Sequence, residues 1–101
     1  MNPTLATYEP PISTHPMPSR AWHPTTKLAP GVWGYTFECE GKIFIPLIVA
    51  EKEGSGDVGR FIDRLSAKCV IMDVTSKRLE GMLLRRGWKK IEVGPNDYWS
   101  R

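Results

Sequence analysis

The placement of proline limits what this chain can fold into more than any other feature of its sequence. Seven of its nine prolines lie within the first 30 of its 101 residues. Because proline has no backbone N–H and a fixed φ, a segment this rich in it forms neither a helix nor an interior strand. We therefore expect residues 1–30 to form an extended arm. We expect the arm to dock on another chain, the alternative being the surface of its own domain.

Beyond the arm, the sequence carries the hydrophobic patterns of regular structure. Strands are predicted at 32–39 and 42–50, joined by a tight turn at Glu40 and Gly41. The second strand is apolar on both faces, which is typical of a central strand. Pro46 lies within it and predicts a bulge or a kink, because proline cannot donate to the ladder.

Two helices are predicted from apolar residues at helical spacing. The first covers 59–65, and Asp57 is placed to cap its N-terminus. The second and clearer one covers 75–90, with Ser76 as its N-cap. Gly87 is expected to end it in the left-handed conformation.

A third strand is predicted at 68–74, and one or two short strands close the chain from residue 89. Strands that alternate with helices predict an α/β fold in which helices serve as crossovers. We expect residues 31–101 to form one domain, a small mixed sheet with two helices.

Charge and cysteine content restrict the function further. The net charge of +3 comes from 14 basic residues interspersed with 11 acidic ones, a pattern that does not predict a nucleic-acid partner. No apolar run has the length to cross a membrane, and residues 1–20 lack the apolar core of a secretory signal. Cys39 and Cys69 lie in apolar runs, far apart, and are expected to be buried hydrophobes without a metal. These features predict a cytoplasmic protein with no membrane partner and no metal.

A glycine-rich stretch, EKEGSGDVGRF at 51–61, follows the predicted central strand and precedes the first helix. Backbone N–H groups and the helix dipole make such a junction an anion site, although a plain connecting loop has the same pattern. It has neither the lysine of a P-loop nor a complete GxGxxG. The candidate site comprises Gly54, Ser55, Gly56, Asp57, Val58 and Gly59.

The order of elements over residues 42–101 resembles the C-terminal half of the general N-acetyltransferase (GNAT) superfamily. In that family the loop pattern is Gln/Arg-x-x-Gly-x-Gly/Ala, and its amides hold the pyrophosphate of acetyl-CoA. DVGRFID at 57–63 falls on the run that continues this loop. SKRLEGMLLRRGW at 76–88 has the spacing of the downstream Asn-x-x-Ala-x-x-x-Tyr-x-x-x-Gly-Phe. The residues that agree in the first run are Val58, Gly59, Arg60 and Ile62.

Several positions depart from the family pattern. Gly54 stands at the Gln/Arg position, and Asp57 stands where the family has a glycine. A carboxylate beside a pyrophosphate is repulsive by several kcal/mol at an effective dielectric of about 20. Ser76 and Leu79 replace the asparagine and the alanine, and Leu83 replaces the tyrosine that often acts as general acid. The family's acceptor-side strand and helices are missing, and the proline arm occupies that part of the chain.

The resemblance therefore implies a degenerate GNAT-like module that is not an enzyme, has no cofactor and makes protein–protein contacts within a larger assembly. Small GNAT-like proteins of this kind are similar to bacteriophage proteins, virion components among them, so the virion is an alternative location. The other reading is an acetyl-CoA-dependent N-acetyltransferase with a minimal core. The remnant of the acetyl-CoA loop would comprise Gly54, Ser55, Gly56, Val58, Gly59 and Arg60.

Tryptophan and arginine supply the candidate contact residues. Trp22 in the arm and Trp99 near the C-terminus are candidates to anchor an interface with a protein partner or a second copy. Arg78 and Arg85 lie two turns apart on one face of the second predicted helix, where they would form a basic stripe. A solvated helix surface is the plainer explanation of that stripe.

Overall fold

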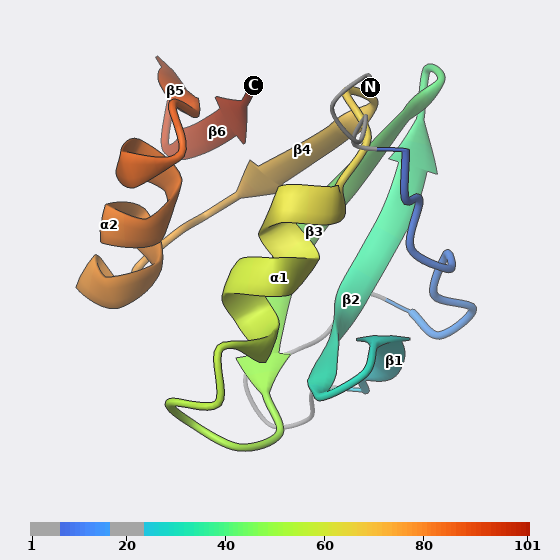
Figure 1. Cartoon of the computed structure of the whole chain (residues 1–101). Helices are drawn as coiled ribbons and strands as arrows, with labels where there is room; N and C mark the ends of the chain where they lie inside the picture. The colour runs from blue at the N-terminus through green and yellow to red at the C-terminus, as the bar shows by residue number, and fades with distance from the viewer. Residues whose placement is uncertain (1–6, 17–23) are drawn as a thin grey trace, which may run out of the picture.

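The computed structural model describes residues 7–16 and 24–101, and these form a mixed six-stranded sheet with two helices, as predicted (Figure 1). The elements are β1 (Thr26–Ala29), β2 (Val32–Cys39), β3 (Lys42–Ala50), α1 (Asp57–Arg64), β4 (Cys69–Met72), α2 (Lys77–Arg85), β5 (Lys89–Val93) and β6 (Asn96–Ser100).

The strands lie in the order β1-β2-β3-β4-β6-β5. Only β3 and β4 are parallel, because α1 returns the chain between them; every other neighbouring pair is antiparallel. The prediction that β3 is central is confirmed, and the chain closes as a β5–β6 hairpin at the far edge.

Pro46 disturbs the central strand as expected. Tyr35 pairs with Leu47 and Phe37 with Phe44, so two residues of β3, Ile45 and Pro46, stand against one residue of β2. This is a β-bulge, which bends the strand that carries the extra residue. On the other side of β3, pairing with β4 ends at Ile45. The two parallel strands separate beyond this point.

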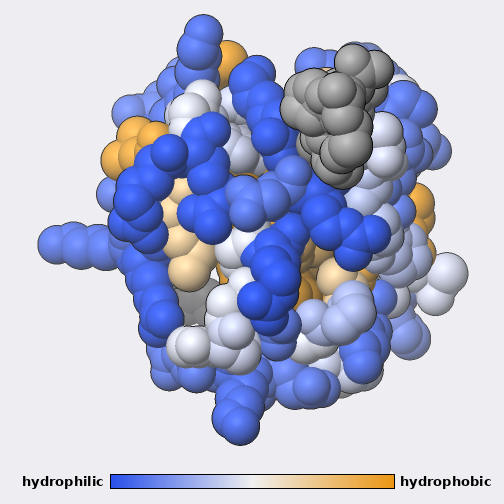
Figure 2. Space-filling model, viewed as in Figure 1, coloured by the Kyte–Doolittle hydropathy of each residue, from blue (hydrophilic) through white to orange (hydrophobic). Residues whose placement is uncertain are grey.

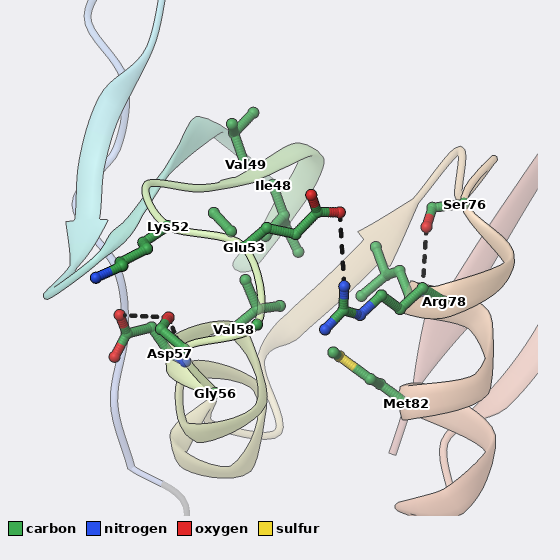
Figure 3. Close-up of a pocket in the computed structure, with 14 residues that line it drawn as sticks. Ile48, Val49, Lys52, Glu53, Gly56, Asp57, Val58, Ser76, Arg78 and Met82 are labelled. Carbon is green, nitrogen blue, oxygen red and sulfur yellow. Dashed lines mark hydrogen bonds and ion pairs between the residues drawn. The ribbon is translucent and has the colours of Figure 1, made fainter.

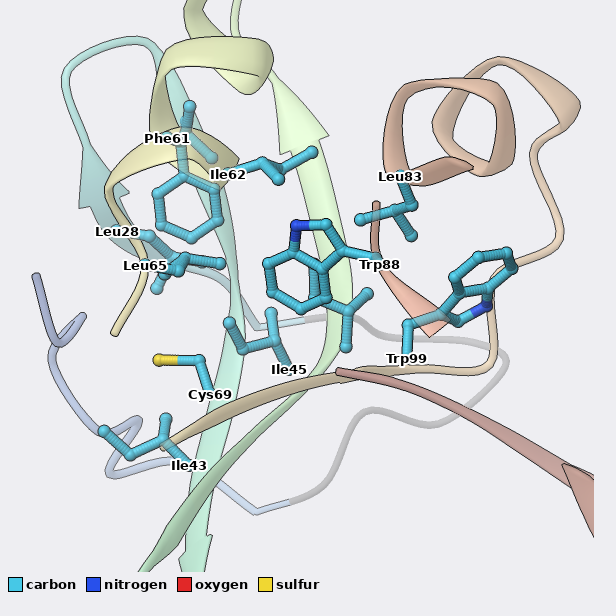
Figure 4. Packing of buried hydrophobic residues seen from close by; sticks show 12 residues of the cluster. Leu28, Ile43, Ile45, Phe61, Ile62, Leu65, Cys69, Leu83, Trp88 and Trp99 are labelled. Carbon is cyan, nitrogen blue, oxygen red and sulfur yellow. The ribbon is translucent and has the colours of Figure 1, made fainter. Parts of the chain in front are cut away.

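Both helices lie on the same face of the sheet (Figures 1 and 4). Register explains which strand residues face them: Ile45 pairs with Ile71, and Ile71 with Trp99, so the three side chains share one face. Phe61 of α1 and Leu83 of α2 pack against this row. On the opposite face, Phe37 stacks on Phe44, and Phe44 meets Tyr98 edge to face.

α2 is shorter than predicted and α1 begins two residues earlier than predicted, but the end signals of α2 are confirmed. The Leu79 N–H donates to Ser76 Oγ at 3.2 Å, and Gly87 has φ of 79° just after the helix. β4 ends at Met72 because Asp73 takes a positive φ of 55°, outside the strand region. Among the residues that the structure describes, no helix is long and apolar enough to cross a membrane.

The described part of the arm, residues 7–16, lies on its own domain, which was the alternative to docking on another chain. The Tyr8 N–H donates to the Arg64 carbonyl at 2.9 Å, and the Ser66 N–H donates to the Tyr8 carbonyl at the same distance. The Tyr8 hydroxyl donates to the Leu28 carbonyl, and its ring meets Phe61 edge to face.

Part of the segment assigned to the arm belongs to the sheet. Residues 26–29 form β1, and the Leu28 side chain is buried in the core. This stretch pairs with β2 and is therefore a structural part of the domain. It can form a strand because the run TTKLA between Pro24 and Pro30 is free of proline. Trp22 lies outside the described residues.

The two cysteines differ, although the sequence predicted burial for both. Cys69 is buried beneath α1, and that burial raises the pKa of its thiol. Cys39 is exposed because it ends β2 beside the hairpin turn, so for this residue the prediction was wrong. Both thiols are free.

Replacing Tyr8 with alanine should lower the free energy of unfolding by about 2 kcal/mol, because the half-buried ring loses its contact with Phe61. Glu9→Ala is the control: it removes only an exposed ion pair with Lys68 at 3.8 Å and should be nearly neutral. Urea unfolding measures both. Equal midpoints for Tyr8→Ala and Glu9→Ala would show that the arm does not stabilise the domain.

The two buried tryptophans give a matched pair of substitutions. Trp99 Nε1–H donates to Asp97 Oδ2 at 3.1 Å, whereas the buried Trp88 Nε1–H has no partner among the described residues. Trp99→Phe should therefore cost about 1 kcal/mol more than Trp88→Phe, since only the first breaks a hydrogen bond. Chemical denaturation of both variants tests this, and a larger loss for Trp88→Phe would contradict it.

Candidate functional site

A groove of about 500 Å³ lies where the end of β3, the loop at 51–56 and the first turns of α1 and α2 meet (Figure 3). The surface is hollowed between the two helices in the space-filling view (Figure 2). The lining residues are Ile48, Val49, Ala50, Lys52, Glu53, Gly54, Ser55, Gly56, Asp57, Val58, Ser76, Arg78, Leu79 and Met82.

The groove exists because β3 and β4 separate after the bulge. A smaller hollow of about 100 Å³ occupies the gap between these strands and includes Pro46 and Ile71 in its walls. Ile48, Ser76 and Leu79 line both hollows, so the two adjoin. The site is therefore at the carboxyl ends of the two parallel strands, where ligands bind in many open α/β sheets.

The glycine-rich loop takes backbone conformations that require glycine. Gly54 and Gly56 have φ of 80° and 83°, in the left-handed region that residues with a Cβ rarely adopt. Gly56 is the N-cap of α1 and offers no side chain to the helix. The prediction that Asp57 is the cap was wrong: Asp57 is the first residue of the helix. The Asp57 N–H itself donates to Ser55 Oγ at 3.3 Å.

Asp57 turns its carboxylate away from the groove. Ser55 Oγ–H donates to Asp57 Oδ2 at 2.9 Å, and Arg60 Nη2–H donates to Asp57 Oδ1. The carboxylate lies so close to Gly31 that a Cβ there would be 2.1 Å from Oδ2. The Arg60 and Ser55 hydrogen bonds, together with the charge of Arg60, lower the pKa of Asp57 below its ordinary value. The charge of Asp57 is thus neutralised at the back of the loop.

This arrangement leaves N–H groups at the start of α1 open to a ligand. The first N–H groups of a helix have no intrahelical partner, and the first such bond here runs from the Arg60 N–H to the Gly56 carbonyl. In the described part of the chain, the N–H groups of Val58 and Gly59 have neither a capping side chain nor a loop carbonyl as partner. Val58 lines the groove, so the start of α1 borders it.

The walls combine apolar side chains with Lys52 and with an ion pair between Arg78 and Glu53. Ile48, Val58 and Met82 supply apolar surface. Arg78 Nη1 meets Glu53 Oε1 at 3.5 Å across the groove. Both side chains are largely exposed, so this pair is weak and an anionic ligand could compete for Arg78. The groove suits a ligand that has an anionic end near the loop and an apolar portion along α2.

The structure brings together some of the residues singled out in the sequence and separates others. Gly54, Ser55, Gly56, Val58 and Arg78 line the groove. Gly59 is buried against Arg86, Arg60 pairs with Asp57, and Arg85 lies outside the groove. Trp99 is only 1% exposed and packs in the core of its own domain, so its ring does not anchor an interface in this fold.

Glu53 and Met82 line the groove, but the sequence did not identify them as site residues. Glu53 could have been found from its place in the glycine-rich stretch, because a residue of that loop is close to anything the loop binds. Met82 carried no such signal. Its helical spacing indicated the core, and only the crossing of α2 over the separated strands brings it to the groove.

Asp57→Asn should destabilise the protein at neutral pH, with a smaller difference from wild type in acid. A lowered folded-state pKa means that the Asp57 charge stabilises the fold above the ordinary carboxyl pKa, and that this stabilisation is lost as pH falls through the folded-state value. Thermal unfolding between neutral pH and pH about 3 measures the difference. In the Asp57→Asn variant, a further Arg60→Gln substitution should change the stability little, because the ion pair is already lost. If the stability losses of the two substitutions add fully, the ion pair is excluded as the cause.

The groove offers binding groups in place of metal ligands. In segments 7–16 and 24–101, no cluster of three or more His, Cys, Asp or Glu side chains could hold a metal ion. Comparisons of the chain with models of protein families, with curated proteins and with solved structures find no match. The chemistry of the groove and of the surface is therefore what bears on function.

Proposed function

We propose that this chain is a GNAT-like α/β module that makes protein–protein contacts within a larger assembly and does not transfer acetyl groups. One observation carries this proposal: Leu84, Ile91 and Val93 are 60%, 56% and 59% exposed. All three belong to the β5 end of the molecule, because Glu80, one turn before Leu84 on α2, meets Lys90 of β5 at 3.9 Å. They flank β5 on both faces of the sheet, Leu84 on the helix face and Ile91 on the other. Exposed apolar side chains of this kind are typical of protein contact sites.

The order of elements supports the GNAT-like part of the proposal. The resemblance rests on a central strand, a glycine-rich loop, a helix, a strand and a second helix, and β3, α1, β4 and α2 follow that order. The loop at 51–56 and the start of α1 form one wall of the groove. The residues at the family's loop positions are therefore at a place where a coenzyme pyrophosphate could lie.

Two side-chain positions support a role without catalysis. Leu83, which stands at the position of the family's tyrosine, is completely buried in the core. Asp57 is held by Ser55 and Arg60, with its carboxylate against Gly31. General acid–base catalysis needs a titratable group directed at the reacting atoms, and neither Leu83 nor Asp57 supplies one.

The resemblance to small bacteriophage proteins suggests the nature of the assembly. A virion component meets many copies of a few proteins, and a compact module with an exposed apolar end is suited to such contacts. This suggestion rests on the resemblance alone.

The second candidate is a domain that binds acetyl-CoA, and the groove favours it. Uncapped N–H groups at the start of α1, with Arg78 on the opposite wall, are suited to phosphate. Apolar surface at Val58 and Met82 could cover the pantetheine portion. Binding without turnover would be consistent with a module whose family once used the coenzyme.

Calorimetric titration with acetyl-CoA separates the two candidates. We expect no binding at millimolar ligand, and no thiol release when amine acceptors are added. Micromolar binding together with acetyl transfer would overturn the proposed function.

A matched pair of charge reversals locates any binding that does occur. Arg78→Glu should weaken binding in the groove by about tenfold or more, whereas Arg85→Glu, on the same helix but outside the groove, should not. Equal losses in the two variants would indicate general attraction of an anion to a basic helix. The proposed site in the groove would then be wrong.

A further inference from the structure

The two edges of the sheet differ in how they are covered. On one side, β1 pairs with β2, and the Ser13 N–H of the arm donates to the Thr36 carbonyl at 3.1 Å, so arm and strand together cover the β2 edge. On the other side, β5 is the last strand, and among the described residues it pairs only with β6. All five β5 residues are exposed. An open edge of this kind is a template for another strand.

Alternation fixes which main-chain groups of β5 point outward. The two-residue turn between β5 and β6 is flanked by the pair Val93 and Asn96, which closes the hairpin. Along an antiparallel strand, the N–H and C=O groups of successive residues point to alternate edges. Val93 directs these groups toward β6, and Ile91 and Lys89 therefore do the same. The N–H and C=O groups of Lys90 and Glu92 therefore point to the open edge.

These outward groups permit only a few registers for two antiparallel β5 strands related by a two-fold axis. Residues with outward groups must face each other, so the axis can pass through residue 90, 91 or 92. An axis at residue 90 places the two Lys90 side chains opposite each other, and an axis at residue 92 does the same for the two Glu92 side chains. Like charges directly opposite each other destabilise the pairing. An axis at Ile91 sets Lys90 of each copy against Glu92 of the other. Only this register pairs opposite charges twice.

Apolar side chains support the same register on both faces of the sheet. Ile91 pairs with Tyr98, on the face opposite the helices, and the two-fold axis would bring Ile91 against its own copy. On the helix face, Leu84 lies on the stripe of α2 that borders β5 and is 60% exposed. The apolar area at the margin of the helix face, over α2 and β5, is visible in Figure 2. Pairing through β5 would bury apolar surface on both sides of the joined sheet.

We infer that a second copy of this chain binds at the β5 edge, in an antiparallel pairing centred on Ile91 that joins two six-stranded sheets into one. The inference rests on the proposed role in protein contacts and identifies the partner. Lysine on an edge strand commonly prevents association. In β5, Lys90 and Glu92 flank Ile91. Repulsion between like charges disfavours the registers centred on residues 90 and 92, and attraction between Lys90 and Glu92 favours the register centred on Ile91.

Two charge variants test the register when each is measured alone, and their mixture tests whether the β5 charges of the two copies face each other. Sedimentation velocity should show a dimer for the wild type. Glu92→Lys places a lysine opposite Lys90 of the second copy, and Lys90→Glu places a glutamate opposite Glu92, so each variant alone should dissociate at least about tenfold more readily. An equimolar mixture should recover the dimer, because every cross-strand pair then has opposite charges. Circular dichroism confirms that each exposed-site variant is folded.

Two further substitutions distinguish the β5 edge from the arm. Ile91→Asp should give a monomer, whereas Ile12→Asp, which adds the same charge at a 41% exposed position of the arm, should remain a dimer. The reverse result would assign the contact to the arm and overturn the inference. A monomeric wild type, or a mixture that fails to recover the dimer, would also overturn it. Such results leave the acetyl-CoA titration unchanged, so failure of this inference is distinguishable from failure of the proposed function.

Discussion

One proline in the central strand determines the shape of the whole site. Pro46 offers no N–H to the ladder, and the bulge around it coincides with the end of pairing between β3 and β4 at Ile45. Beyond that point the parallel strands separate, and the groove and its smaller neighbour occupy the gap. Residues from β3, the glycine-rich loop and α2 meet there only because the sheet is open. A local defect in hydrogen bonding thus creates a groove in which distant segments present polar groups together.

The position of both helices on one face has consequences at the two edges of the sheet. The main core cluster forms beneath α1 and α2, around Ile45, Ile71 and Trp99. The arm is tied to the end of α1 by the Tyr8 hydrogen bonds with Arg64 and Ser66, and to β2 by the hydrogen bond from Ser13 to Thr36. No described segment does the same for β5, although its side chains include exposed isoleucine and valine. This asymmetry between a covered and an open edge is the basis of the pairing that we infer at β5.

The elements that depend on local chemistry were predictable from the sequence. The turn at Glu40 and Gly41, the Ser76 cap and the bulge at Pro46 are each decided by a few adjacent residues, and the structure contains all three. Asp57 shows where such reasoning fails. Its carboxylate could serve the helix start, but Ser55 and Arg60 hold it at the back of the loop, against Gly31, a residue 26 positions away in the chain. A contact between distant segments took precedence over a local preference.

The sequence by itself therefore determined the α/β class, the order of the elements from residue 32 onward and the position of the glycine-rich loop, because hydrophobic period, capping residues and proline act over a few residues. Only the tertiary structure decided which side chains are accessible. It buries Trp99 and exposes Cys39, and it leaves Lys90, Ile91 and Glu92 on an open edge. Burial depends on which segments pack over a residue, and edge position depends on strand order. Both are properties of the folded chain that no short stretch of sequence contains.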